Sequence, residues 1–332
     1  MQITIRRKYT GISLVGLMIA LLLGSILLSG LITVFSSNQT TSRLMFDFGS
    51  LQEGARAANH VLESSIRQAG HFGGVDPIDI LTNSSLTLKG KGNCNHAWIT
   101  ATSEPIRAYD GNSTITHVTN LPNGCIEASD YVANTDILSL KYGSTIGMAK
   151  LSDLDANTVY VRTVTASNEQ ISGEIFKGDS KPSIGGSSDA LGIYNFKYAS
   201  ELYYIRACSQ KINGVCHDNI PSLVRYQLDG LEFKEYLLIA GVEQFQIEFG
   251  IDSDADYNAD QYLSPSAIKD WQQVISVKFS LVIRGKTQDN SLLDTETYTL
   301  VGNVNYTPKN EDQAYRRRTY TKVVQLRNMV RG

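Results

Sequence analysis

The pattern of apolar and polar residues changes sharply near the start of the chain. Residues 12–35 contain no charged side chain and are mostly Leu, Ile, Val, Met and Gly, whereas Arg6, Arg7 and Lys8 stand shortly before them. As a helix rising about 1.5 Å per residue, the 24 residues of this run extend about 36 Å, enough to cross a bilayer core of about 30 Å with some tilt. The cations predict that the N-terminal side stays in the cytoplasm and that the rest of the chain is exported.

The following segment keeps helical spacing but has only one apolar face. Its charged and amide residues fill one side, and its apolar residues recur every three or four positions at Leu44, Phe48, Leu51, Ala55, Ala58, Leu62, Ile66 and Ala69. No proline interrupts residues 12–76, and Gly70, Gly73 and Gly74 supply a stop. The pattern predicts one helix, apolar on all sides over residues 12–35 and amphipathic over residues 36–72.

After residue 73 the pattern is that of β-strands joined by loops. Residues 73–130 are rich in Gly, Asn, Ser and Thr, and strand signals occur at 137–142, 158–163, 201–207, 223–228, 244–251 and 275–283. The last two segments alternate apolar and polar residues, as strands do when one face packs on a core and the other meets solvent. The predicted fold class is α+β: a long N-terminal helix packed on a large antiparallel β-sheet head at residues 73–332. The glycine-rich residues 166–192 predict a boundary between two lobes of this head.

The position of Gly11 directly before the apolar run indicates how the N-terminal segment is processed. An ordinary secretory signal is cleaved after its apolar core, whereas the basic patch and Gly11 stand before it. This arrangement resembles the class III leader of type IV pilins and type II secretion pseudopilins. The resemblance implies that residues 1–11 are a leader, that prepilin peptidase cleaves between Gly11 and Ile12, and that Ile12 becomes N-methylated. A plain membrane anchor, or a signal peptide cut near 29–30 or 36–37, needs no amphipathic continuation.

Segments at both ends of the chain narrow this resemblance to the PilW-type minor pilins. They are Leu51–Arg56, Ile66–Gly74, Pro221–Tyr226, Leu238–Phe245, Phe249–Asp256, Trp271, Val282–Arg284, Tyr315–Arg318 and Val323–Asn328. The resemblance implies a minor pilin that takes part in initiation and assembly of the type IV pilus and supports twitching motility and adhesion. The implied partners are other minor pilins, the major pilin, prepilin peptidase and the assembly platform of the inner membrane. The chain would lie in that membrane before assembly, with its head in the periplasm, and then in the pilus at the cell surface.

One residue departs from the superfamily pattern. Pilins usually carry glutamate at the fifth mature position, where this chain has Gly16. That glutamate pairs with the free amine of a neighbouring subunit's first residue in the apolar filament core, where a carboxylate needs a partner. The loss is either tolerated in a subunit of low copy number or typical of a subunit at the filament tip. At the tip no preceding subunit supplies an N-terminal amine that needs a carboxylate partner.

Net charge and cysteine content bear on nucleic-acid binding, disulfide formation and zinc binding. The formal net charge is −3, and removal of the three leader cations would make it −6, so nothing in the charge balance favours nucleic acid as a partner. Four cysteines in an exported head favour two disulfides. Of three pairings, Cys94–Cys125 and Cys208–Cys216 are preferred because each closes a local loop. The alternative is a zinc site from Cys94, His96, Cys216 and His217, whose spacing matches no standard ligand pattern.

An acidic segment carries a candidate calcium site. Oxygen-bearing side chains occupy positions 1, 3, 5, 7 and 9 of a segment that resembles the first part of an EF-hand loop: Asp252, Asp254, Asp256, Asn258 and Asp260. Position 6 is Tyr257 rather than Gly and position 12 is Leu263 rather than Glu, so a calcium ion would bind modestly unless Glu248 or Asp270 contributes. The alternative is a solvated hairpin loop rich in turn formers. No cofactor is required on either reading.

Catalytic motifs are missing from the sequence. It has no G-x-S-x-G elbow, no H-E-x-x-H, no phosphate-binding loop and no dinucleotide fingerprint. The Tyr-Arg-Arg-Arg run at 315–318 has the composition of a single-strand nucleic-acid site. Alternation in a strand would divide its arginines between two faces, so a solvated or acid-paired strand is the preferred interpretation. An assembly subunit is therefore the first hypothesis, and a tip adhesin or a type II secretion pseudopilin is the alternative.

Overall fold

The computed structural model describes residue 11 and residues 13–329, except 166–170, 187–189 and 290. The leader cations and Ile12 lie outside the described residues, so their predicted roles stay predictions. The chain divides into two compact units, Met1–Ser50 and Leu51–Gly332, which are described separately below.

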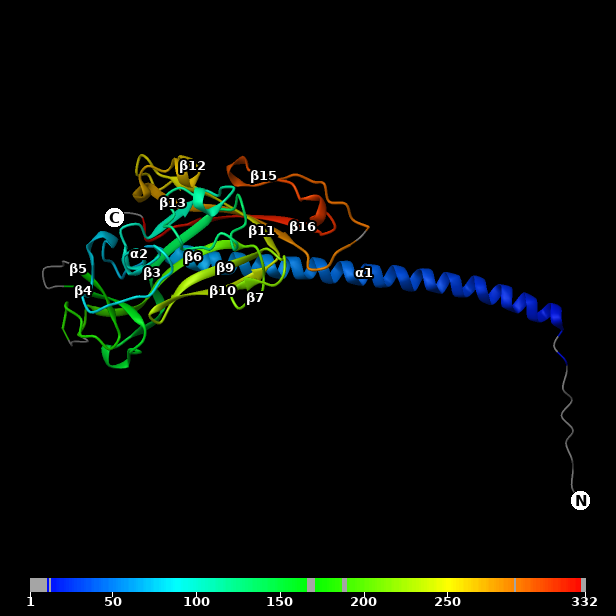
Figure 1. Cartoon of the computed structure of the whole chain (residues 1–332), viewed down its shortest axis with the longest axis horizontal. Coiled ribbons are helices and arrows are strands. Elements are labelled where there is room, and N and C mark those ends of the chain that lie inside the picture. Colours follow the sequence, from blue (N-terminus) through cyan, green and yellow to red (C-terminus); the bar gives the residue numbers. More distant parts are fainter. Residues whose placement is uncertain (1–10, 12, 166–170, 187–189, 290, 330–332) are drawn as a thin grey trace, which may run out of the picture. The chain divides into compact units, whose positions relative to one another are not determined.

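A single helix, α1 (Leu14–Gln68), extends from the first unit into the second (Figure 1). Its first half contains a window of mean hydropathy 2.5 that is long and apolar enough to span a membrane. The helix ends where Gly70 adopts φ of 75°, a left-handed conformation that favours glycine. The predicted continuous helix is confirmed, although it stops at Gln68 rather than at residue 72.

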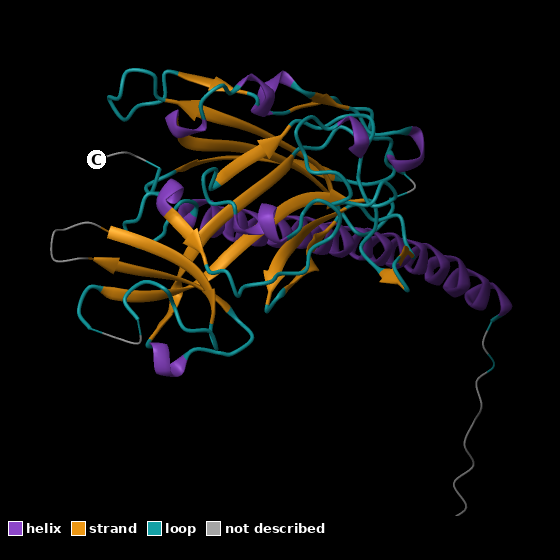
Figure 2. Cartoon of the chain, turned by 60° about the vertical axis from the view of Figure 1, so that its left-hand side comes forward, coloured by secondary structure: helices purple, strands orange, loops and turns teal. Residues whose placement is uncertain are grey.

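From Leu51 onward one face of α1 is buried in the head. The buried side chains are those of the predicted apolar stripe, and each is at most 1% exposed: Leu51, Ala55, Ala58, Leu62 and Ile66. Polar contacts place the same segment: Ser65 accepts a hydrogen bond of 2.8 Å from the Tyr203 hydroxyl, and Glu63 pairs with Lys322. These two partners belong to different sheets, so this part of α1 lies along both of them (Figure 2).

The larger sheet has eight strands. Its main order is β1 (Ile80–Thr82), β5 (Ile171–Lys177), β4 (Val159–Thr165), β6 (Ile193–Arg206), β3 (Ile137–Ala149) and β2 (Ile106–Tyr109), to which β9 (Ser222–Asp229) and β10 (Glu232–Ala240) are added. One edge of β6 pairs first with β4 and then with β9, while its other edge pairs with β3. All pairings are antiparallel except that of β1 with β5.

The smaller sheet is antiparallel throughout. Its order is β12 (Gln261–Leu263), β11 (Val242–Ile251), β13 (Val274–Arg284) and β16 (Arg317–Gln325). Two short hairpins lie outside both sheets: β7 (Lys211–Ile212) with β8 (Val215–Cys216), and β14 (Tyr298–Thr299) with β15 (Asn305–Tyr306). The short helices are α2 (His96–Thr100), η1 (Pro77–Asp79), η2 (Ile115–His117), η3 (Leu151–Asp153), η4 (Pro265–Ala267), η5 (Trp271–Gln273), η6 (Val301–Asn303) and η7 (Asn310–Asp312).

The expected lobe boundary at residues 166–192 is wrong. Strand β4 precedes this segment, β5 lies within it and β6 follows it, and all three are hydrogen-bonded neighbours in one sheet. Its glycines serve turns between these strands, with φ of 63° at Gly185 and 87° at Gly192. The chain changes sheet at Gly241 instead, between β10 and β11. A Cβ atom there would lie 2.8 Å from the carbonyl oxygen of Arg284, and φ is 88°, so this tight passage requires glycine.

One buried carboxylate joins the two sheets. Asp136, directly before β3, is 3% exposed and donates its backbone N–H to the carbonyl oxygen of Phe245 in β11 at 2.8 Å. Its side chain accepts hydrogen bonds from Ile247 at 2.7 Å and from Gly111 at 2.8 Å. Burial raises the pKa of Asp136 to about 7, although the two N–H donors act in the opposite direction.

This shift predicts a pH dependence of stability. The folded state binds more protons than the unfolded state between the ordinary pKa of 3.8 and about 7, so the contribution of Asp136 is fully present below pH 3.8 and is lost as the pH rises to 7. The loss amounts to up to about 4 kcal/mol. Denaturant titrations of the full chain in detergent micelles should show a flatter stability curve over this range for Asp136→Asn than for the wild type. The exposed Asp153→Asn variant is the control, and an unchanged slope in Asp136→Asn would contradict the assignment.

Candidate functional site

In the apolar half of α1, hydroxyl groups donate hydrogen bonds to backbone carbonyls of the same helix. In the Leu14–Ser50 part, the hydroxyls of Ser25 and Ser29 donate to carbonyls three residues earlier at 2.8 Å, and that of Thr33 donates to the Ser29 carbonyl at 2.9 Å. Backbone groups of a helix are paired within the segment. The hydroxyls of Ser25, Ser29 and Thr33 are therefore satisfied within the helix, as hydrocarbon surroundings require.

Gly16 lies in the first turns of this segment. Its Cβ position has no neighbouring atom within 4 Å, so the chain itself leaves room for a larger side chain. The first turn of α1 contains no acidic residue. Absence of the glutamate is thus not imposed by packing within the described part of the chain.

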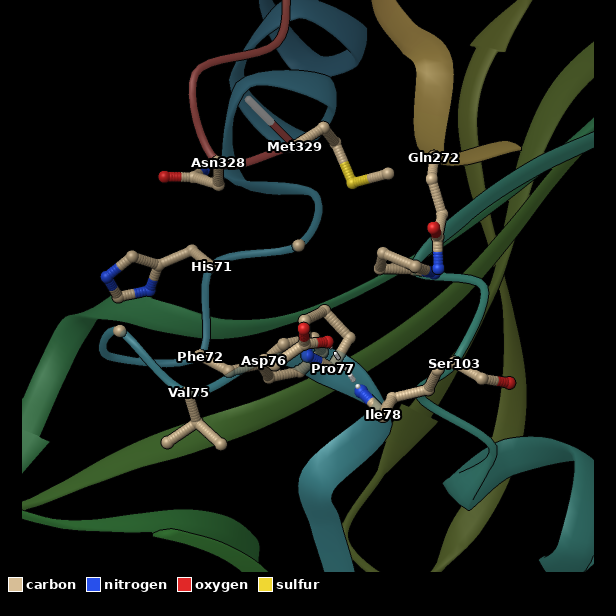
Figure 3. Close-up of a pocket in the computed structure, with 13 residues that line it drawn as sticks. His71, Phe72, Val75, Asp76, Pro77, Ile78, Ser103, Gln272, Asn328 and Met329 are labelled. Atoms are coloured by element: carbon tan, nitrogen blue, oxygen red, sulfur yellow. Dashed lines mark hydrogen bonds between the residues drawn. The ribbon is translucent and has the colours of Figure 1, made fainter. Parts of the chain in front are cut away.

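A cavity of about 610 Å³ lies just beyond the end of α1 (Figure 3). Its lining side chains include His71, Asp76, Gln272, Asn328 and Met329. The two titratable groups are held by backbone atoms: His71 Nδ1 lies 2.8 Å from the carbonyl oxygen of Gly143, and Asp76 caps η1 by accepting from the Ile78 N–H at 3.1 Å. Among the described lining residues no nucleophile is paired with a base, so the cavity offers no catalytic arrangement.

The acidic segment forms the loop between β11 and β12. One carboxylate oxygen from each of Asp252, Asp254 and Asp260 lies within 4.8 Å of the others, a spacing that suits ligands around a calcium ion. Asp256 is not part of this group, because its carboxylate accepts from the Asn258 N–H at 2.8 Å and side-chain amide at 3.1 Å. Glu248 lies with Lys278 at 3.4 Å, and Asp270 accepts from the Gln272 N–H at 2.9 Å. The structure therefore brings together three of the predicted ligands.

Electrostatics in this loop reflects the crowding of like charges. The negative charge of Asp256, followed by burial and the charges of Asp260 and Asp252, raises the pKa of Asp254. Asp260 differs, since hydrogen bonds from the hydroxyl and the N–H of Ser253 lower its pKa. A bound cation would relieve the repulsion at Asp254.

Comparison with known protein families gives one match. Residues 202–328, from within β6 to just past β16, match the family model described as type IV pilus-assembly protein W. The match covers less than half of the chain and lies in the C-terminal part of the head. Among solved structures, a type IV-like pilin from Thermus thermophilus aligns with a TM-score of 0.35 and 10% identity, over 85% of this chain and 98% of its own. No curated protein matches the chain.

The PilW match confirms the resemblance drawn from the sequence segments, and it includes the acidic loop. The matched family model describes a pilus-assembly protein.

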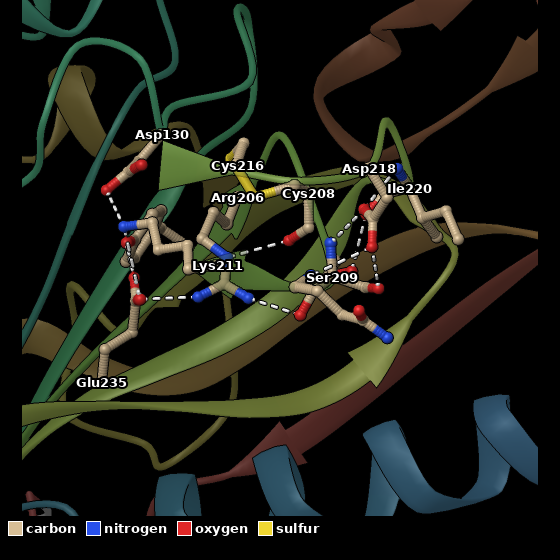
Figure 4. The surroundings of a disulfide bond; sticks show 12 residues. Asp130, Arg206, Cys208, Ser209, Lys211, Cys216, Asp218, Ile220 and Glu235 are labelled. Carbon is tan, nitrogen blue, oxygen red and sulfur yellow. Dashed lines mark hydrogen bonds and ion pairs between the residues drawn. A yellow bond between two sulfur atoms is a disulfide. The ribbon is translucent and has the colours of Figure 1, made fainter. Parts of the chain in front are cut away.

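The four cysteines form two disulfides, Cys94–Cys125 and Cys208–Cys216. These are the pairings that local loop closure favours, and since no described cysteine remains free, the alternative zinc site is excluded. The shorter bridge lies beside Arg206, whose guanidinium donates to the carbonyl oxygens of Cys208 at 2.8 Å and Ser209 at 2.7 Å (Figure 4). Arg206 also pairs with Glu235 at 2.6 Å. The bridge and the arginine together order the β7–β8 hairpin of the PilW-type head.

The buried ion cluster around Arg317 was not predicted. Its side chain is fully buried, donates to Glu243 at 2.9 Å and lies 3.0 Å from Asp294. Arg316 pairs with Asp289 at 2.7 Å. Two arginines of the Tyr-Arg-Arg-Arg run are thus engaged by carboxylates, as an acid-paired strand requires. The alternation of the run could have indicated a buried position, but the identity of its partners could not, because they lie 74 and 23 residues away.

Calcium binding at the acidic loop stays a prediction, now with a discriminating test. We expect Asp254→Asn to abolish calcium binding by the full chain in detergent micelles, because it removes one of the three grouped carboxylates. Asp256→Asn, the matched control, should reduce affinity only slightly because Asp256 lies outside the group. Isothermal titration checks this, in the millimolar to submillimolar range of extracellular sites. Identical traces for wild type and Asp254→Asn would leave the loop as a solvated acidic turn.

Proposed function

We propose that this chain is a minor subunit of a type IV pilus that takes part in initiating and assembling the filament. The observation that carries the proposal is the helix α1. It joins an apolar segment to an amphipathic segment whose apolar face is buried in the head, and residues 202–328 of that head match the pilus-assembly family. A membrane anchor alone needs only the first part. A polymerising subunit needs both, because its apolar segment must leave the bilayer while remaining rigidly continuous with the head.

The topology follows from the same helix. The chain would wait in the inner membrane with its N-terminus in the cytoplasm and its head in the periplasm, where both disulfides can form. Prepilin peptidase would act between Gly11 and Ile12, and the assembly platform would then move the subunit into the filament. Its partners there would be other minor pilins and the major pilin.

Gly16 supports a position near the filament tip. A carboxylate in an apolar helix bundle requires a cationic partner. A subunit at the tip has no earlier subunit above it whose amine would need such a carboxylate. The open space around the Gly16 Cβ position removes the simpler explanation that glutamate does not fit within the chain.

Deletion of the gene in its native host separates the candidate functions. We expect loss of surface pili and of twitching motility, both restored by the wild-type gene, because initiation precedes all filament growth. Electron microscopy and a subsurface twitching assay measure these outcomes. Normal pili with lost attachment would instead indicate a tip adhesin, and intact pili with a secretion defect would indicate a type II secretion pseudopilin. Either result would reject the initiation role.

Restoring the acid at position 16 tests the tip position. We expect Gly16→Glu to reduce piliation or to move the subunit from the tip into the shaft, because the new carboxylate lacks a partner at the tip and gains one below it. Gly16→Ala is the matched control and should behave as wild type, since its methyl group meets no atom of the chain. Immunogold labelling of sheared filaments gives the position. Wild-type label along the shaft would refute the tip assignment.

A further inference from the structure

The two disulfides differ in their access to solvent. Cys94, Cys125 and Cys208 are each at most 3% exposed, whereas Cys216 is half-buried. A reagent in solution can therefore approach one of the four half-cystines and not the other three. Thiol–disulfide exchange requires direct attack of a thiolate on a sulfur atom, so access decides which bridge reacts and at which end.

Cys208 belongs to the firmly held side of its bridge. Its carbonyl oxygen accepts a hydrogen bond of 2.8 Å from the guanidinium of Arg206, which also donates to the carbonyl oxygen of Ser209 at 2.7 Å. The carboxylate of Asp218 accepts from the N–H of Ser209 at 2.7 Å and from its hydroxyl at 2.6 Å (Figure 4). These bonds hold the base of the loop without any contribution from the disulfide.

Cys216 belongs to a hairpin with little structure of its own. Strands β7 and β8 have two residues each, and they are joined by Asn213 and Gly214 with φ of 52° and 81°. Ile212 and Val215 are 52% and 69% exposed, so the hairpin buries little apolar surface. A two-stranded hairpin of this size is marginally stable by itself.

The hairpin has one side-chain attachment to the head besides the disulfide. The ammonium group of Lys211 pairs with the buried carboxylate of Asp130 and lies 3.6 Å from the carboxylate of Glu235 (Figure 4). Within the described segment 211–216, no other side chain forms a hydrogen bond or an ion pair. The ordered hairpin therefore depends on the Cys208–Cys216 bridge together with Lys211.

We propose that Cys216 is a site of thiol–disulfide exchange, at which a protein dithiol of the C-x-x-C type opens the bridge to Cys208 and frees the β7–β8 hairpin. A dithiol is the required class of reactant, because the bridge has to gain two electrons and one dithiol supplies both as it closes to its own disulfide. The Cys94–Cys125 bridge has no exposed end and serves structure alone. This exchange depends on the head and not on a role in filament initiation.

The exchange balances in two steps. In the first, a thiolate of the dithiol attacks the Cys216 sulfur, the bond between the two cysteine sulfurs breaks, and Cys208 leaves as a thiolate that takes up a proton. In the second, the other thiolate of the dithiol attacks the partner sulfur bound to Cys216, which leaves as a thiolate and is protonated in turn. The dithiol gives up two electrons and two protons, and the bridge receives them. The reverse steps close the bridge.

Selective reduction tests the difference between the two bridges. The probe is reduced dithiothreitol, added to the full chain in detergent micelles. Samples are quenched with acid, free thiols are blocked with N-ethylmaleimide, and mass spectrometry of peptides gives the rate for each bridge. We expect the Cys208–Cys216 bridge to open at least tenfold faster than the Cys94–Cys125 bridge, because only the first has a half-cystine that solvent reaches.

A monothiol identifies the sulfur that is attacked. Reduced glutathione has no second thiol to complete the reduction within the mixed disulfide, so the adduct of the first step can be trapped by acid. We expect glutathione on Cys216 in at least tenfold excess over glutathione on Cys208. Peptide mass spectrometry of the quenched sample measures this ratio.

Hydrogen exchange shows whether reduction frees the hairpin. After reduction, the peptide that contains residues 211–216 should exchange its amides at least tenfold faster, while strand β9 stays unchanged. The Cys208→Ser/Cys216→Ser variant is the matched control. It should show the fast exchange without reductant and no further change when reductant is added, and slow exchange of β9 shows that this variant is folded.

Three results would overturn the proposal. Equal rates for the two bridges would mean that access to Cys216 does not control the reaction. Glutathione bound mainly to Cys208 would assign the attack to the other end of the bridge. Unchanged exchange of residues 211–216 after reduction would show that the hairpin is held without the disulfide.

Discussion

One helix has to suit two different environments, and the rest of the structure depends on how it does so. Up to Phe35 the helix presents apolar side chains on all sides, and Ser25, Ser29 and Thr33 donate their hydroxyls to carbonyls of the same helix. From Leu51 it presents a single stripe that is almost completely buried. Burial of such a stripe is the main driving force for docking a helix on a sheet. Because Ser65 and Glu63 contact one sheet each, the same two turns of α1 position both sheets of the head.

The sheets are further joined by buried polar groups rather than by apolar packing alone. Asp136 ties the start of β3 in the larger sheet to β11 in the smaller sheet, whereas the pair of Glu243 and Arg317 joins β11 to β16 within the smaller sheet. Removal of one partner from such a pair leaves a buried charge uncompensated, which is strongly destabilising. Asp136 thus holds β3 against β11, and the Glu243–Arg317 pair holds β16 in place within the smaller sheet.

Much of this architecture was predictable, and the failures have physical causes. The long helix and the strands β11 and β13 were found because burial of one face imposes a period on the sequence. The assignment of residues 166–192 as a boundary failed because glycine marks tight turns within a sheet as readily as links between lobes. Strand β16 was not assigned because its first residues are arginines, and only distant carboxylates make Arg317 an interior residue. In the acidic loop, spacing could suggest oxygen ligands, but the turning of Asp256 toward Asn258 depends on local hydrogen bonds.

An apolar helix and an open strand edge supply different kinds of information for association. An apolar helix associates through burial and dispersion, which are nearly independent of sliding and rotation. A strand edge associates through spaced donors and acceptors, so displacement by one residue turns every side chain to the wrong face. A subunit with only the first surface would join a helix bundle without a defined neighbour. The edge of β16 opposite β13 is the part of the smaller sheet where a nine-residue row of such donors and acceptors lies without a backbone partner among the described residues.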